Sequence, residues 1–184
     1  LKAQEIRNCV YQGKCNDLLF ELNKRNSWRR ILGLDVEDSR MADLELILRY
    51  FAMRDLHIRN EGQLKQINLA KYLNQYMSDK TRTTEEDILN MKQDFIQMID
   101  KVFELFGKTA FKNLKKESEN FASRINPAIF DAISVATSYA IKTGVEFTQE
   151  DYLEKYKSLL KNEEFLRASS SRTTNIDNIK IRIQ

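Results

Sequence analysis

The scarcity of turn-forming residues is the feature that most constrains how this chain folds. Its 184 residues include five glycines and one proline, whereas a strand-rich domain of this length needs a turn roughly every ten residues. A chain of this size also buries roughly 70% of the surface that it exposes when unfolded, so it needs no disulfide or metal for stability. The sequence therefore predicts an all-α fold.

Apolar residues recur at three- and four-residue steps over most of the chain, as in helices that bury one face. No segment shows the alternation of apolar and polar residues that is typical of a strand. In the first predicted helix, Ile6, Val10 and Cys9 are expected to face inward. The spacing predicts helices over 3–11, 15–24, 27–32, 40–58, 63–79, 84–106, 148–161 and 176–184, with a weaker, charged helix at 109–121.

Residues 127–142 are predicted to form the central helix. Asn126 can cap a helix with its side chain, and Pro127 suits the first helical position, where a missing N–H leaves nothing unpaired. The residues that follow are apolar on nearly every side and carry little charge, which is typical of a helix surrounded by others. We expect an irregular bundle of about seven to nine helices around 127–142, forming one domain over 1–184 with sub-lobes at 1–80 and 84–184.

The residues needed for a self-contained catalytic or metal site are scarce. His57 is the only histidine, and the spacing of Cys9 and Cys15 does not suit zinc. Phe106-Gly107-Lys108-Thr109 ends like a phosphate-binding loop, but it lacks the first glycine of that motif and follows a helix instead of a strand, so a helix end explains it better. We predict no catalytic residue, no metal and no cofactor in this chain.

The chain carries no signal peptide and no apolar run near the 18 or so residues that span a bilayer. A cytoplasmic location with no membrane contact is the resulting expectation, and the two cysteines are expected to be free thiols. Because Leu1 opens directly into helical sequence, we also expect the chain to be a fragment of a larger protein.

Clustered arginines raise the question of phosphate binding. The net charge is +3, and the excess lies in residues 165–184. Four arginines occupy the predicted helix 40–58 or its end, beside several acidic residues. They either form ion pairs within and between helices or contact phosphate. The second interpretation names Arg40 and Arg49, together with Arg172 and Arg182 from the C-terminal segment.

A series of short segments adds a family resemblance. In chain order they are Gln4-Glu5-Ile6-Arg7-Asn8-Cys9-Val10-Tyr11 with Gly13, Arg40-Met41 with Asp43, Glu45 and Leu48-Arg49-Tyr50-Phe51-Ala52, Tyr72-Leu73-Asn74 with Met77, Phe106-Gly107 with Ala110-Phe111, Arg124-Ile125-Asn126 with Phe130-Asp131-Ala132, and Arg182-Ile183. Their residues and order resemble the helical region of the GmrSD-like restriction family. The resemblance spans almost the whole chain, although each segment is short.

In that family, a ParB-like domain with a D-G-Q-Q-R motif precedes the helical region and is associated with nucleotide hydrolysis and cleavage of modified DNA in phage defence. Neither this motif nor the histidines of an HNH nuclease occur here. The resemblance therefore implies a non-catalytic scaffold whose partner is the N-terminal domain, and Glu5, Arg7 and Asn8 are expected to pack against that domain. A DNA-contacting module and a homo-oligomerisation module, neither of them enzymatic, remain alternatives.

Overall fold

The computed structural model describes the chain except for residues 59–66, 116–117, 147–148, 171–172, 174–175 and 184. The described part is mainly helical, which confirms the predicted fold class. Its helices are α1 (Ala3–Val10), α2 (Lys14–Asn23), α3 (Asn26–Leu32), α4 (Ala42–Ile58), α5 (Leu69–Asp79), α6 (Glu85–Phe106), α7 (Pro127–Lys142), α8 (Gln149–Lys161), α9 (Glu163–Ser170) and α10 (Ile176–Ile183), with 3-10 turns η1 (Lys80–Arg82) and η2 (Gly107–Thr109).

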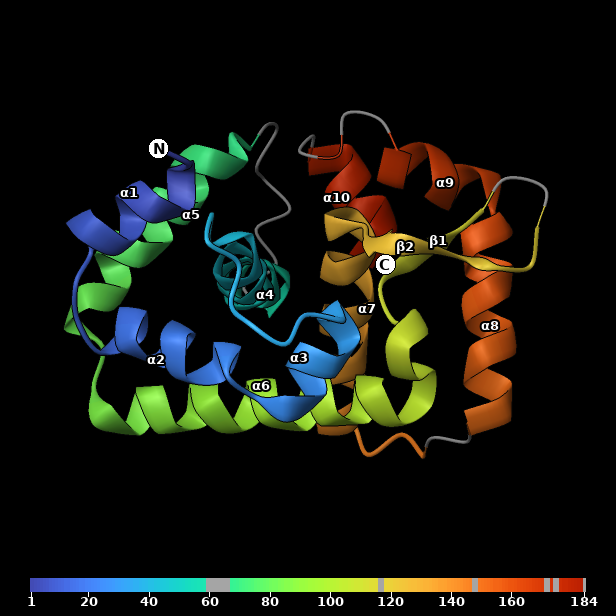
Figure 1. The fold of residues 1–184 in the computed structure, drawn as a ribbon, viewed down its shortest axis with the longest axis horizontal. Helices are drawn as coiled ribbons and strands as arrows, with labels where there is room; N and C mark the ends of the chain where they lie inside the picture. Colours follow the sequence, from blue (N-terminus) through green and yellow to red (C-terminus); the bar gives the residue numbers. More distant parts are fainter. Residues whose placement is uncertain (59–66, 116–117, 147–148, 171–172, 174–175, 184) are drawn as a thin grey trace.

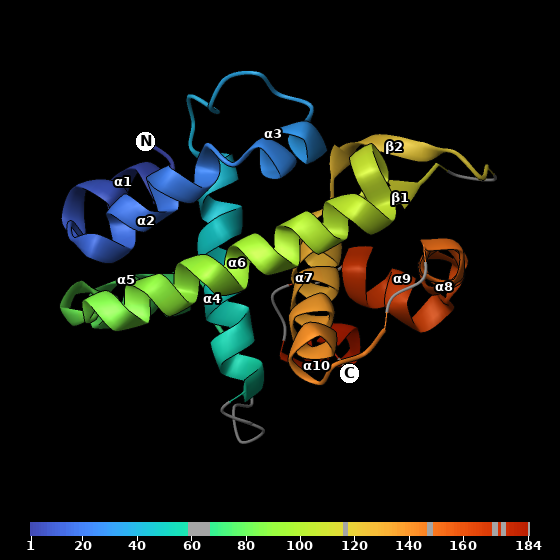
Figure 2. The same cartoon turned by 90° about the horizontal axis from the view of Figure 1, so that it is seen from below.

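Three long helices form the centre of the molecule. The helices α4 and α7 lie side by side, and α6 crosses both of them (Figure 2). Helices α2 and α3 pack along α6, whereas α1 and α5 cover one end of the molecule and α8, α9 and α10 cover the other (Figure 1). This arrangement brings the first turns of α1, α4 and α7 toward one face of the molecule.

A cluster of aromatic rings joins these layers. Phe95 of α6 contacts Trp28 of α3 edge-on, with ring centroids 6.3 Å apart, and Tyr50 of α4 at 5.5 Å. Phe130 of α7 contacts the same Trp28 at 5.6 Å. Packing of this kind stabilises a fold beyond the area that it buries. Residues of both predicted sub-lobes therefore share one hydrophobic core.

The predicted central helix is α7, with the predicted bounds. The Asn126 side chain accepts a hydrogen bond from the Ala128 amide at 2.9 Å, and Pro127 occupies the first turn. Ile129 and Phe130 are fully buried. The central position is shared with α4, in which every residue from 46 to 53 is buried.

Helix ends largely follow the local signals of the sequence. Thr84 and Asp87 form a reciprocal capping box at the start of α6, as their spacing predicts. Gly33 and Gly107 end α3 and α6 with φ of 68° and 52°, a region that favours glycine. Met41 also has a positive φ, of 59°, and α4 accordingly begins at Ala42, two residues later than predicted.

The prediction of a helix over 109–121 is wrong, as is the expectation of no strand. Strands β1 (Lys112–Leu114) and β2 (Phe121–Ile125) pair antiparallel, with Lys112 opposite Ile125. Contacts from distant segments stabilise the hairpin, since the Tyr156 hydroxyl donates to the Lys112 carbonyl at 2.9 Å. Such tertiary contacts override weak local preference.

Two further helix predictions need correction. Helix α9 has no counterpart among the predicted helices, which leave the segment between 161 and 176 unassigned. Helix α5 begins at Leu69, where Asn68 caps it by accepting from the Lys71 amide, so residues 67 and 68 of the predicted helix precede it. Residues 63–66 of that prediction lie outside the described residues.

Candidate functional site

The polar residues of α1 face the interior of this chain. Arg7 is almost fully buried, and its Nη1 donates to Glu45 Oε2 of α4 at 2.9 Å and to Gln4 Oε1 at 3.0 Å. Its Nε donates to Asn74 Oδ1 of α5 at 2.8 Å. Arg7 thus links α1 to both α4 and α5. A buried guanidinium with three such bonds is well satisfied.

Asn8 and Glu5 extend this attachment toward the start of α4. The Asn8 amide accepts from Gln4 Nε2 at 2.8 Å and donates to the sulfur of Met41 at 2.9 Å. Glu5 forms an ion pair with Arg40 Nε at 3.1 Å. The three residues expected at an interdomain interface therefore bind other parts of this chain, and Arg7 and Asn8 are buried instead of solvated.

The apolar residues of α1 lie on its outer face. Ile6 is 48% exposed and Val10 is 62% exposed, and Cys9 between them is exposed as well. Leu1, just before the helix, is also exposed. The expectation that Ile6, Val10 and Cys9 face inward is wrong, because α4 and α5 offer polar partners to the opposite face.

A cavity of about 450 Å³ lies beside α1. The first residues of three helices line it, namely Ala3 of α1, Ala42 of α4 and Pro127 of α7. Three cationic side chains and one carboxylate also face it, and Ile125 of β2 closes one side. We call it the α1–α4–α7 cavity; its remaining lining residues are Lys2, Gln4, Arg40, Met41, Glu45, Leu46 and Arg49.

Two of the four predicted phosphate-contacting arginines line this cavity, namely Arg40 and Arg49. Arg49 is nine-tenths buried and binds Asp131 of α7 with two nitrogens; Nε is 3.1 Å from Oδ1, and Nη2 pairs with Oδ2. Arg182 lies 3.8 Å from the same Asp131 carboxylate and donates to the carbonyls of Ala168 and Thr173. Arg172 lies outside the described residues.

In this structure Arg49 and Arg182 therefore form ion pairs within the chain, which is the other interpretation of these arginines. Arg182 has a fully buried side chain, which removes it from any external phosphate. Arg40 is different, because its side chain is 57% exposed and only Nε is engaged by Glu5. Arg54 of α4 also pairs within the chain, with Asp94 and Asp55.

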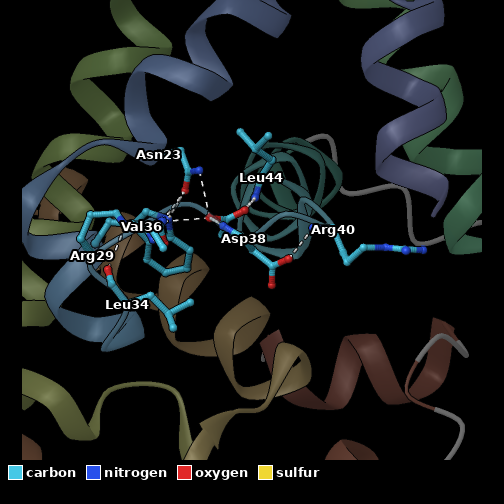
Figure 3. A network of polar contacts seen from close by, with 9 residues as sticks. Asn23, Arg29, Leu34, Val36, Asp38, Arg40 and Leu44 are labelled. Atoms are coloured by element: carbon cyan, nitrogen blue, oxygen red, sulfur yellow. Dashed lines mark hydrogen bonds and ion pairs between the residues drawn. The ribbon is translucent and has the colours of Figure 1, made fainter. Parts of the chain in front are cut away.

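A buried carboxylate fixes the loop that carries Arg40. Asp43 Oδ2 accepts from Asn23 at 3.0 Å, from Arg29 at 2.8 Å and from the Asp38 amide at 2.9 Å. Figure 3 shows this network, with the Arg40 side chain extending away from it. Burial opposes the charge on Asp43, but these hydrogen bonds outweigh it and lower the pKa of the carboxyl.

The described residues contain no group of three or more His, Cys, Asp and Glu side chains arranged to hold a metal ion. No helix in the described part of the chain is long and apolar enough to cross a membrane. The Gly107-Lys108-Thr109 segment is the end of α6 and the turn η2, as the helix-end interpretation predicts.

Comparisons with protein-family models, with curated proteins and with solved structures found no match to this chain. The sites described above therefore rest on the geometry of this molecule alone.

Sequence reasoning did not find the cavity. Met41 and Glu45 lie 80 or more residues before Ile125 and Pro127, and no local pattern joins the two segments. Only the helix starts could have pointed to the cavity from sequence, as Asn126-Pro127 does for the beginning of α7. Which helix starts converge depends on the crossing of α4, α6 and α7.

Proposed function

We propose that this chain is a non-catalytic helical scaffold that supports the nucleotide-hydrolysing domain of a GmrSD-like restriction protein. The resemblance of its ordered segments to that family suggests the partner. The observation that carries the proposal is the orientation of α1, which turns polar residues inward and leaves Ile6 and Val10 exposed.

Helix α1 is held in place although it is short. Isolated helices below about 12 residues are marginal in water, and α1 has eight residues. The bonds of Arg7 to α4 and α5 fix it on the bundle. The exposed side chains of Ile6 and Val10 form an apolar ridge on α1. Because this ridge is already ordered, it loses little conformational entropy when a partner covers it, which suits a docking element.

The small size of this ridge favours a partner in the same polypeptide. An eight-residue helix is about 12 Å long and about 10 Å across with its side chains. Stable interfaces between separate proteins bury roughly 800 Å² on each side. A tethered domain needs less area, because the tether holds it at an effective concentration in the millimolar range.

The test uses the protein that contains this chain together with the domain encoded ahead of it. Ile6→Asp and Val10→Asp each place a charge on the outer face of α1. Leu89→Asp is the matched control, because Leu89 is an exposed apolar residue on α6. We expect the two α1 variants to lose phage restriction and nucleotide hydrolysis, and the Leu89 variant to retain both.

Several outcomes would overturn the proposal. One is a gene that encodes no ParB-like domain ahead of this chain. A second is wild-type activity in both α1 variants. A third is that the isolated chain sediments as a dimer and that Val10→Asp converts it to a monomer. The ridge would then bind a second copy of this chain.

A further inference from the structure

Three helix N-termini converge on the α1–α4–α7 cavity. Ala3, Ala42 and Pro127 are the first residues of their helices, and all three line it. The helix dipole places partial positive charge at such ends. Pro127 has no N–H, and the Ala128 and Leu44 amides already donate to Asn126 and Asp43, so the contribution of these ends comes mainly from the dipoles. Three such ends around one space create a field that favours an anion.

Arg49 supplies a directed donor at this space. Its side chain is nine-tenths buried and lines the cavity. Asp131 engages Nε and Nη2, whereas Nη1 has no hydrogen-bond partner among the described residues. Nη1 is not one of the fully buried nitrogens that lack a partner, so it stays accessible and can donate to a ligand in the cavity.

The remaining charges of the lining are arranged in favour of an anion. Within the described part of the chain, Glu5 engages Nε of Arg40 and its two terminal nitrogens have no partner. Lys2 adds a third cationic side chain. Glu45, the one carboxylate of the lining, is neutralised by Arg7 at 2.9 Å. The lining is therefore positive, and its cations surround one space.

The walls that carry no charge define the rest of the ligand. Met41, Leu46 and Ile125 give an apolar surface next to the arginines. The volume of about 450 Å³ falls within the roughly 300–1,000 Å³ that is usual for small-molecule sites. We propose that this cavity binds a small organic phosphate monoester, with its phosphate between Arg40 and Arg49 and its body against these apolar side chains.

A phosphate suits this lining better than a carboxylate. A phosphate monoester carries between one and two negative charges at neutral pH and three acceptor oxygens. These oxygens can accept from the fork of one arginine and from a second cation at once. Binding here requires no partner domain, so its test is separate from the test of the scaffold role.

Phenyl phosphate, inorganic phosphate and benzoate are the probes, titrated into the whole chain and followed by ligand-detected NMR at low ionic strength. We expect phenyl phosphate to bind saturably and more tightly than the other two. Arg40→Gln should weaken its binding at least tenfold, since one charged hydrogen-bond donor is removed. Arg124→Gln is the matched control, because Arg124 is exposed on β2 beside Ile125 but does not line the cavity.

A second variant separates binding from folding. Ala3→Phe fills the cavity from the exposed first turn of α1 and should abolish binding, while the midpoint of urea unfolding stays that of the wild type. Absence of saturable binding to the wild-type chain would overturn the proposal. Equal weakening by Arg40→Gln and Arg124→Gln would do so too, since it would mean attraction by general charge. Binding of inorganic phosphate or benzoate at least as tight as that of phenyl phosphate would contradict the assigned ligand class.

Discussion

The buried charge cluster of Asp131 gives the sharpest test of the structure. Asp131 is 1% exposed and lies in the second turn of α7. It joins α4 through Arg49 and faces Arg182 of α10 at 3.8 Å. The isosteric substitution Asp131→Asn keeps the volume and removes the charge, so two buried guanidiniums lose their carboxylate.

Breaking a buried pair by removing one partner costs about 3–5 kcal/mol. The new amide still accepts one hydrogen bond from Arg49, so we expect a loss of about 3–4 kcal/mol in the free energy of unfolding. This is a large part of the 5–15 kcal/mol that a domain typically has. For a chain of this length it corresponds to a fall in Tm of about 10 °C.

Urea unfolding followed by the fluorescence of Trp28 measures this loss directly. Trp28 is the only tryptophan and is fully buried beside Phe130, so its emission reports the state of the core. Glu119→Gln is the matched control, because Glu119 also bridges two cations, Lys157 and Lys161, but at the surface. Its midpoint should not change measurably.

A double variant tests the physical reason for the loss. If the loss in Asp131→Asn comes from stranded positive charge, removing Arg49 as well should recover part of it. Asp131→Asn with Arg49→Met should therefore be more stable than Asp131→Asn alone. A double variant that loses the sum of both single losses would refute this reasoning, since the two residues would then act independently.

The remaining predictions concern titration and thiol chemistry. Hydrogen bonds lower the pKa of the Asp43 carboxyl in the folded state. The contribution of this carboxylate to stability is therefore present above its unfolded pKa of about 3.9 and is lost as the pH falls through its folded pKa. Asp43→Asn is expected to be less stable at pH 7, and its urea midpoint should fall less than that of the wild type between pH 7 and pH 3. Burial raises the pKa of the Cys15 thiol to about 11, so a disulfide reagent at pH 8 should titrate only the exposed Cys9 in the native chain and both thiols in denaturant.

Signals within a few residues of each other were sufficient for most helices. The start of α7 follows from Asn126-Pro127, and the start of α6 follows from the reciprocal bonds of Thr84 and Asp87. These features act over one helical turn, so the sequence contains them directly. The hairpin had no such signal. Its strands of three and five residues depend on Tyr156, which lies more than 30 residues further along the chain.

The function of individual arginines depended on partners that no local pattern reveals. Arg40 and Arg49 lie nine residues apart on one segment and looked alike in sequence. In the fold, Arg49 meets Asp131 from a helix 82 residues away, whereas Arg40 meets Glu5 and keeps an exposed guanidinium. Tertiary packing therefore set how much of each guanidinium is used in an ion pair, namely Nε and Nη2 in Arg49 and Nε in Arg40.

Helix α1 shows why the direction of an amphipathic helix cannot be taken from hydrophobicity alone. Its polar residues Gln4, Arg7 and Asn8 recur with the same helical period as its apolar ones, so either face could be the buried one. Glu45 and Asn74 decide the matter, because they meet Arg7 from other helices. In the isolated chain, polar substitution should consequently be tolerated better at Ile6 and Val10 than at Arg7. Greater tolerance at Ile6 and Val10 would fit the proposed docking role of α1, whereas equal losses at all three positions would mean that the exposed face contributes to the stability of this chain itself.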